Sequence, residues 1–183
     1  MKKILVACYS HSGHTKNLGQ RISSAAGADL EVIEDKTVRK GAAGYLKSAV
    51  EAALHMQPQI KAVKYAPGDY DLVVIGTPIW LSNMASPVRS YISQHCKHVK
   101  EFAFFCTYSG SGQFNVMKNL TKLVGRPTVA TLALTDKTIA ADQFRKPLAR
   151  LISQIRNTGI HTGFVRHRGR WAGAKDRLMS GGW

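Results

Sequence analysis

Residues 3–15 of the chain read KILVACYSHSGHT. The run from Lys3 to Tyr9 is rich in Ile, Leu and Val, which is typical of a strand buried in a parallel sheet. A polar turn containing Gly13 follows, and from His14 to Ala26 the apolar positions recur at helical spacing until Gly27. A strand that leads directly into a helix is the repeating unit of α/β proteins. This stretch therefore predicts that class.

The remainder of the chain alternates between strand-like and helix-like segments in the same way. We expect strand three to end at Thr77-Pro78, because proline has no N–H to give to the sheet. Such an alternation predicts a doubly wound five-stranded parallel sheet with helices on both faces. The predicted strands cover residues 3–9, 30–33, 70–76, 99–107 and 128–134, and the predicted helices cover residues 14–26, 44–55, 87–95, 113–124 and 141–155. We expect a domain over residues 1–155 and a basic C-terminal extension over 156–183.

The chain is unusually basic for its size. Its 183 residues suffice for one domain with a single core. The 26 Lys and Arg against 11 Asp and Glu give a formal net charge of +15, spread over the body and the C-terminal extension. Such a charge favours encounters with acidic proteins, nucleic acid or anionic membrane surfaces. No apolar run approaches the roughly 20 residues that span a bilayer, and no signal-peptide pattern is present, so we expect a cytoplasmic protein.

Cysteine and histidine positions do not predict a metal centre or a disulfide framework. Cys8 and Cys106 lie in apolar runs, where buried and inert thiols are expected. His11 and His14, and likewise the group at residues 95–98, have ligand-like spacing without the third and fourth ligands of a metal site. We expect no bound metal.

Three polar loops follow the predicted strands at the edge where α/β sheets bind ligands. They cover residues 10–15, 77–83 and 107–112. The first presents three hydroxyl groups, a glycine and a helix N-terminus, which together suit a phosphate group, although the same residues could simply cap the helix. It contains neither GxxxxGK[ST] nor GxGxxG, so a single phosphomonoester suits it better than a dinucleotide.

Aromatic residues next to the other two loops suit a flat redox ring. Trp80 and Tyr108 each lie close to a predicted strand end, beside small and polar residues that could reach the edge of such a ring. Either one could also be an ordinary packing residue at the rim. The combination with a phosphate loop favours the ligand interpretation.

With these motifs the chain resembles the short-chain flavodoxins. The resemblance rests on residues 10–15 (SHSGHT), on 76–80 (GTPIW) with 87–89 (PVR), and on 104–107 (FFCT) with 109–112 (SGSG). It implies the strand order 2-1-3-4-5 and a non-covalently bound FMN. The residues that the resemblance implies for cofactor binding are Ser10, His11, Ser12, Gly13, His14, Thr15, Lys16, Asn17, Thr77, Pro78, Ile79, Trp80, Thr107, Tyr108, Ser109 and Gly110.

The implied function is electron transfer through FMN, with no catalytic acid, base or nucleophile from the protein. Two roles stay open, a single-electron carrier and a small NAD(P)H-dependent quinone or FMN reductase. Typical flavodoxins are acidic and dock on basic reductases, so the positive charge of this chain suggests an acidic redox partner instead. A flavin-free module that binds an acidic partner or nucleic acid is the alternative from another class, although nucleic acid is the less favoured ligand. The basic segment 165–171 also leaves peripheral contact with anionic lipid open.

Overall fold

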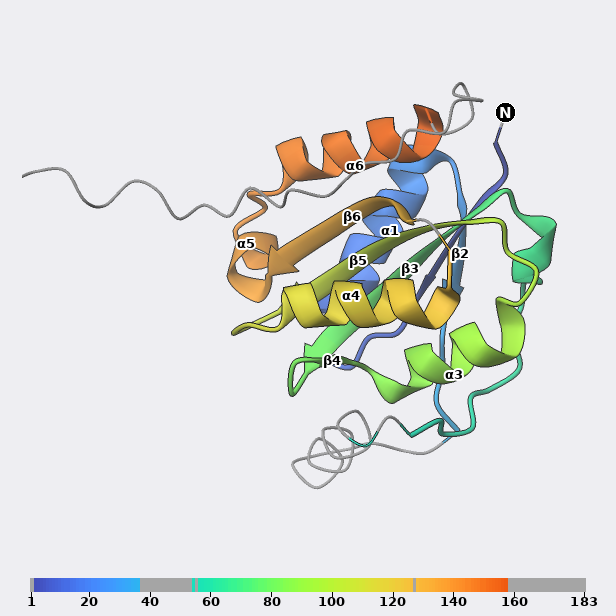
Figure 1. The fold of residues 1–183 in the computed structure, drawn as a ribbon. Helices are drawn as coiled ribbons and strands as arrows, with labels where there is room; N and C mark the ends of the chain where they lie inside the picture. The colour runs from blue at the N-terminus through green and yellow to red at the C-terminus, as the bar shows by residue number, and fades with distance from the viewer. Residues whose placement is uncertain (1, 37–53, 55, 127, 158–183) are drawn as a thin grey trace, which may run out of the picture.

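The computed structural model describes residues 2–36, 54, 56–126 and 128–157. Its centre is a twisted sheet whose parallel strands lie in the order β2-β1-β3-β5-β6, with the short strand β4 paired to β3 (Figure 1). Counted without β4, this order is 2-1-3-4-5, which confirms the expected topology. The parallel strands are β1 (Ile4–Cys8), β2 (Asp29–Val32), β3 (Leu72–Trp80), β5 (Glu101–Tyr108) and β6 (Thr128–Thr135).

Helices cover both faces of this sheet, as expected for a doubly wound fold (Figure 1). Side chains of α1 (His14–Ala26) and α6 (Arg145–Asn157) pack in one hydrophobic cluster with Ile4, Val6 and Cys8. Side chains of α3 (Ser86–His95) and α4 (Gln113–Val124) pack in the other cluster with Leu5 and Ala7. Successive residues of β1 therefore point to opposite faces, both of which are covered, and this explains why the strand is apolar throughout.

Glycines with positive φ lie at both ends of α1 and α4, the two helices whose observed limits agree with the approximate limits that we predicted. Helix α1 begins after Gly13 (φ 97°) and ends at Gly27 (φ 65°), and α4 begins after Gly112 (φ 107°) and ends at Gly125 (φ 62°). Glycine adopts this left-handed conformation without the clash that a Cβ would cause. Helix α3 begins one residue before the expected start at Pro87.

The expected end of strand three at Thr77-Pro78 is wrong. Strand β3 continues to Trp80, with Thr77 opposite Cys106 and Pro78 opposite Thr107 on β5. On its other side the pairing with β1 stops at Gly76, whose carbonyl accepts from the N–H of Tyr9. Because Pro78 faces this unpaired side, its missing N–H costs no sheet hydrogen bond.

A β-hairpin stands where the sequence indicated a loop. The turn residues Leu81 (φ 44°) and Ser82 (φ 58°) connect β3 to β4 (Asn83–Met84), which runs antiparallel with Trp80 opposite Asn83. Two left-handed residues are the geometry of a tight hairpin turn, in which a bulky residue such as leucine is rare. This conformation stores backbone strain at the carboxyl edge of the sheet.

The closing helix expected over residues 141–155 is present, but it begins later than predicted, at Arg145. The structure has a short helix α5 (Asp136–Ala140), then a turn in which Asp142 has φ 53°, and then α6. Thr135 caps α5 by accepting from the N–H of Thr138 at 3.1 Å. A continuous helix would place Pro147 where an N–H is required, whereas in the first turn of α6 none is needed.

Two expectations lie outside the described residues. All but one residue of the predicted helix 44–55 lies outside the described ranges. Nearly all of the C-terminal extension also lies outside them, because the described residues end at Asn157. A short 3-10 helix (Pro67–Asp69) precedes β3. Within the described ranges no helix is both long and apolar enough to cross a bilayer.

Candidate functional site

The carboxyl ends of β1, β3 and β5 bring the three polar segments to one edge of the sheet, on the left in Figure 1. A buried hydrogen bond joins two of them. The hydroxyl groups of Thr15, in the first turn of α1, and Thr107, near the end of β5, lie 2.8 Å apart. The two side chains are 1% and 3% exposed, so water cannot replace this bond. The start of α1 is thereby fixed against β5.

The loop between β1 and α1 is open and rich in hydrogen-bond donors. The Oγ atom of Ser10 accepts from the N–H of Gly13 at 3.1 Å, which closes the turn. The N–H of Asn17 bonds to the carbonyl of Gly13 at 2.9 Å, so the amides of residues 14–16 precede the first intrahelical bond. A Cβ at Gly13 would meet no atom within 4 Å, so the space beside this glycine is open. Amides, hydroxyls and the helix dipole in such a space suit an anion.

Other members of the predicted set in this loop differ in exposure. Ser12 and Lys16 are exposed, and His14 is partly buried. The side chain of Asn17 accepts from Nε of Arg21 at 3.2 Å, one turn further along α1.

Trp80 is buried, so the structure gives it a packing position. Its side chain is 5% exposed and lies edge-on to Tyr9, with ring centroids 5.7 Å apart. The ring of His11 contacts it in the same manner at 6.0 Å. The indole thus packs against Tyr9 and His11, next to the first loop.

At the carboxyl edge of the sheet, the segment after β5 contacts both the start of α5 and the β3–β4 hairpin. Tyr108 is partly buried against the hydrophobic cluster under α3 and α4, and this burial raises the pKa of its phenol. The hydroxyl of Ser109 donates to the carboxylate of Asp136, at the start of α5. A Cβ at Gly112 would lie 2.6 Å from Cα of Ser82, so the hairpin turn packs directly on this loop. Gly110 has open space around it.

Comparison with known proteins identifies the family of this fold and site. A family model of flavodoxin matches residues 3–150, which covers all described strands and the beginning of α6. The chain belongs to the flavodoxin family. A protein from Bacteroides eggerthii DSM 20697 named as a flavoprotein is 30% identical to this flavodoxin-family chain. The match covers 77% of this chain and 95% of that one, with a TM-score of 0.66.

Two further relatives carry names that bear on chemistry. A flavoprotein from Lactobacillus acidophilus NCFM, solved in complex with FMN, is 24% identical, with 77% of this chain and 98% of that chain covered and a TM-score of 0.64. A protein from Chromohalobacter salexigens named NAD(P)H dehydrogenase (quinone) is 31% identical over 101 residues. That match covers 50% of this flavodoxin-family chain and 46% of the relative, so it spans about half the length of that relative.

The sequence interpretation missed a polar cluster behind the hairpin of this flavodoxin-family chain. The Oδ1 atom of Asn83 accepts from the N–H of Met84 at 3.1 Å, from Nη2 of Arg89 at 3.4 Å and from Nδ2 of Asn119 at 3.4 Å. One amide therefore links β4 to α3 and α4. The PVR motif at 87–89 was the available signal, but a motif alone does not reveal that its arginine is buried.

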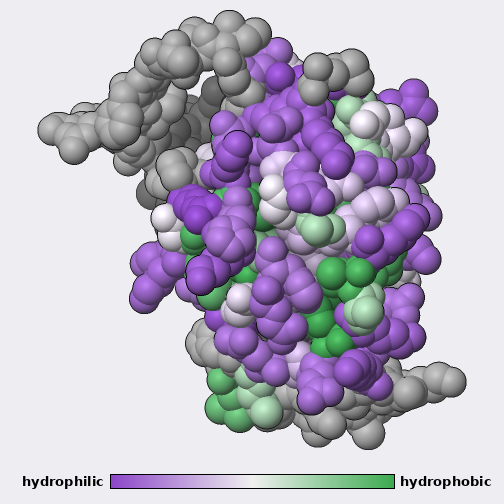
Figure 2. Space-filling view, turned by 90° about the vertical axis from the view of Figure 1, so that its right-hand side faces the viewer, coloured by the Kyte–Doolittle hydropathy of each residue, from purple (hydrophilic) through white to green (hydrophobic). Residues whose placement is uncertain are grey.

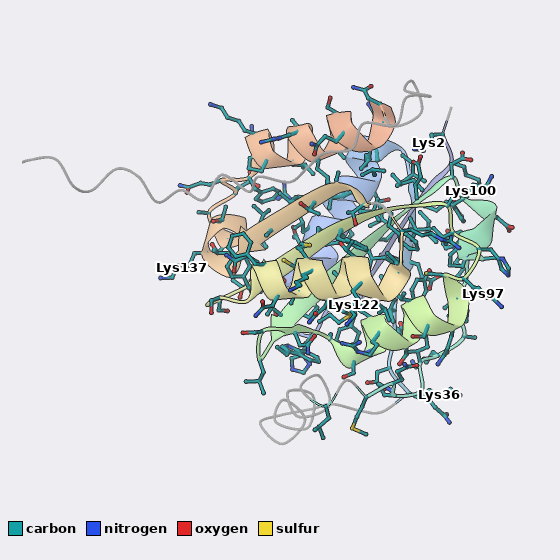
Figure 3. The ribbon with its side chains drawn as sticks, viewed as in Figure 1. Lys2, Lys36, Lys97, Lys100, Lys122 and Lys137 are labelled. Carbon is teal, nitrogen blue, oxygen red and sulfur yellow. The ribbon has the colours of Figure 1, made fainter. Side chains whose placement is uncertain are left out.

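The positive charge is distributed around the molecule and is not confined to the site. Among the labelled lysines in Figure 3, Lys137 lies at the carboxyl edge beside α5, whereas Lys97 and Lys100 lie at the opposite end. That opposite end, seen in Figure 2, carries mainly hydrophilic residues among those described. Nη2 of Arg126 donates to the carbonyl of Lys97 at 2.8 Å, which brings these cationic loops together.

Proposed function

We propose that this chain binds FMN at the carboxyl edge of its sheet and transfers electrons through it. The observation that carries the proposal is the donor-rich, open loop of residues 10–15, held against β5 by the Thr15–Thr107 hydrogen bond in a member of the flavodoxin family. The Lactobacillus acidophilus flavoprotein, which was solved in complex with FMN, supports the same cofactor.

The residues present suit the phosphate group of FMN. The amides of residues 14–16 and the hydroxyls of Ser10 and Ser12 are donors that a phosphomonoester dianion can accept from, and Thr15 fixes the start of α1 behind them through its bond to Thr107. The open space at Gly13 admits the anion to the backbone. In this proposal Lys16 adds positive charge from the exposed side of α1, while His11, His14 and Asn17 complete the surroundings.

In this proposal the ring lies at the carboxyl edge of the sheet, beside the β3–β4 hairpin and residues 107–110. Thr77, Pro78 and Ile79 then line one side, with Trp80 acting through its contacts with Tyr9 and His11. On the other side, Thr107, Tyr108, Ser109 and Gly110 line the ring, and the half-buried phenol of Tyr108 is the aromatic surface available to it.

When bound, FMN supplies the redox chemistry, accepting one or two electrons. The protein's part is to orient the ring, to exclude water with the hairpin, and to set its electronic properties by hydrogen bonds and charge. We assign no catalytic acid, base or nucleophile to the described residues.

Of the two roles within this proposal, a small reductase is supported by a specific observation. The Chromohalobacter salexigens relative is named for oxidation of NAD(P)H and reduction of a quinone. A carrier of single electrons would need a protein partner, and the net charge of +15 favours one with an acidic surface.

The first experiment measures FMN binding by the purified chain. Flavin fluorescence is titrated with protein, and riboflavin, which has the same ring without the phosphate, serves as the matched ligand. We expect FMN to bind at least tenfold more tightly than riboflavin. Equal affinities would contradict the phosphate loop, and the absence of binding by either would contradict the proposed function.

The second experiment separates the two roles. Protein loaded with FMN is mixed with NADH or NADPH without oxygen, and absorbance of the oxidised flavin is followed. Rapid bleaching followed by recovery on adding a quinone supports the reductase. A flavin that stays oxidised with either nucleotide but is reduced by a reductase protein supports the carrier.

A further inference from the structure

Arg89 is a buried cation without a carboxylate partner. Its side chain lies in α3 and is 9% exposed. Its one hydrogen bond in the described structure joins Nη2 to Oδ1 of Asn83 at 3.4 Å, and its buried Nε has no partner. No Asp or Glu among the described residues forms an ion pair with it, and burial alone lowers the pKa of its guanidinium.

The ion pairs that other arginines and lysines form lie nearer the surface. Arg21 lies 3.1 Å from Asp142, Lys61 lies 2.6 Å from Glu34, and Lys2 pairs with Glu101. All of these pairs are at least partly accessible to water, where a lone charge would cost little. Arg89 is buried and has no acidic partner among the described residues, and burial makes an unpaired charge costly.

The described segments that form the hairpin, α3, β5 and α4 contain little negative charge. Glu101 is the only acidic residue between Leu72 and Thr135 in the sequence. It stands at the start of β5, at the end of the sheet remote from the hairpin, where Lys2 neutralises it. The charge of Arg89 is therefore not balanced by the segments that form the hairpin, α3, β5 and α4.

Arg89 is nevertheless close to the hairpin. It lies in the first turn of α3, directly after β4, and its partner Asn83 stands opposite Trp80 in the hairpin register. The proposed function places the flavin ring on this hairpin. A charge in a poorly solvated interior acts on neighbouring groups far more strongly than one in water.

We propose that Arg89 is a positioning residue that Asn83 holds in place next to the hairpin. Its unbalanced charge stabilises the reduced flavin and so favours the two-electron reduction of the flavin. This inference rests on the proposed function. A reduced nicotinamide gives one hydride to the oxidised flavin and becomes the oxidised nicotinamide, and the flavin, having gained two electrons and one proton, gains one negative charge. A nearby uncompensated cation lowers the free energy of that anion relative to the neutral oxidised form. This supports the reductase role over the single-electron carrier.

The test is the midpoint potential of the bound flavin, measured by equilibration with redox dyes. Arg89→Gln removes the charge and keeps a polar side chain. Arg89→Lys, a separate variant, keeps the charge but lacks the planar guanidinium. We expect Arg89→Gln to lower the potential and Arg89→Lys to keep most of the wild-type value. Lys118→Gln, which removes an exposed charge from α4, is the matched control and should shift the potential much less, because water screens it.

A second variant keeps the inference testable if Arg89→Gln does not fold. Asn83→Asp leaves Arg89 in place and sets a carboxylate beside the guanidinium, so it should lower the potential in the same direction. Either variant with bound FMN and an unchanged potential would overturn the role of Arg89 while leaving FMN binding intact. A wild-type chain that binds no FMN would overturn the proposed function and this inference together.

Discussion

The hydroxyl of Thr15 and that of Thr107 form a hydrogen bond of 2.8 Å across the edge of the sheet, although 92 residues separate them in sequence. Both side chains are buried, so either hydroxyl left alone would lack water as a substitute. Thr15→Val keeps the shape and removes the partner of Thr107. We expect it to lower the free energy of unfolding by about 1–2 kcal/mol, measured by urea denaturation.

The Thr15 and Thr107 pair also allows a double-mutant cycle. If the loss comes from the unpaired hydroxyl, Thr15→Val with Thr107→Val should recover part of it. Thr121→Val is the matched control, because its contact with Thr128 at 3.1 Å lies on the exposed surface and should contribute little. Strictly additive effects of the two buried substitutions would contradict the coupling.

Gly13 and Gly27 stand at the two ends of α1, and both have a left-handed conformation. A Cβ at either position would meet no atom within 4 Å. Substitution by alanine strains the backbone at either end, at a cost of about 1 kcal/mol. We expect Gly13→Ala to weaken FMN binding about tenfold as well, because the added methyl group and the shifted amides disturb the proposed phosphate site. Gly27→Ala, at the far end of α1, should leave FMN affinity unchanged. Equal affinities of the two variants in a fluorescence titration would place the phosphate elsewhere.

Gly76 is required because the tightly packed core has no room for a side chain at this position, and not because a turn needs a positive φ there. A Cβ at this position would lie 2.1 Å from the ring of Phe105 on the neighbouring strand. We expect Gly76→Ala to lower the free energy of unfolding by about 2–3 kcal/mol through overpacking. The double variant with Phe105→Leu should recover part of this loss, because it removes the atoms that clash. A single variant as stable as the wild type would show that Phe105 can move aside.

Local signals account for the elements that the sequence predicted well. Glycines precede and follow helices α1 and α4, and the approximate limits predicted from the sequence agree with the structure. The interruption between α5 and α6 also had a local signal, since Pro147 opposes a continuous helix from residue 141. That signal was available and was missed.

Contacts between distant segments explain the features that could not be predicted. Strand β3 continues through Pro78 because β1 stops pairing at Gly76, and no residue near Pro78 in the sequence reveals this. The burial of Trp80 depends on Tyr9 and His11, about 70 residues earlier in the chain. The isolation of Arg89 depends on which acidic residues are near it in space. The family motifs indicated the edge of the sheet that holds the site, but not how its residues pack.

The three buried thiols should make the protein sensitive to alkaline pH. Burial raises the pKa of Cys8, Cys96 and Cys106 to about 12, from 9.0 for an accessible thiol. Between pH 9 and 10 the unfolded chain loses these protons and the folded chain keeps them, so the stability present below pH 9 declines as the pH rises. Each thiol contributes a slope of about 1.4 kcal/mol per pH unit once the unfolded group is fully ionised.

Removing one thiol tests this assignment. The thiols together add a slope to the plot of unfolding free energy against pH between 9 and 10. In Cys106→Ala this added slope should fall by about one third, because one of the three thiols is gone. A loss of packing in the variant shifts the whole plot and leaves the slope unaffected. Urea denaturation at closely spaced pH values, under reducing conditions, gives this slope directly. A slope equal to that of the wild type would mean that the Cys106 thiol ionises as readily in the folded protein as in the unfolded chain, which its complete burial in β5 argues against.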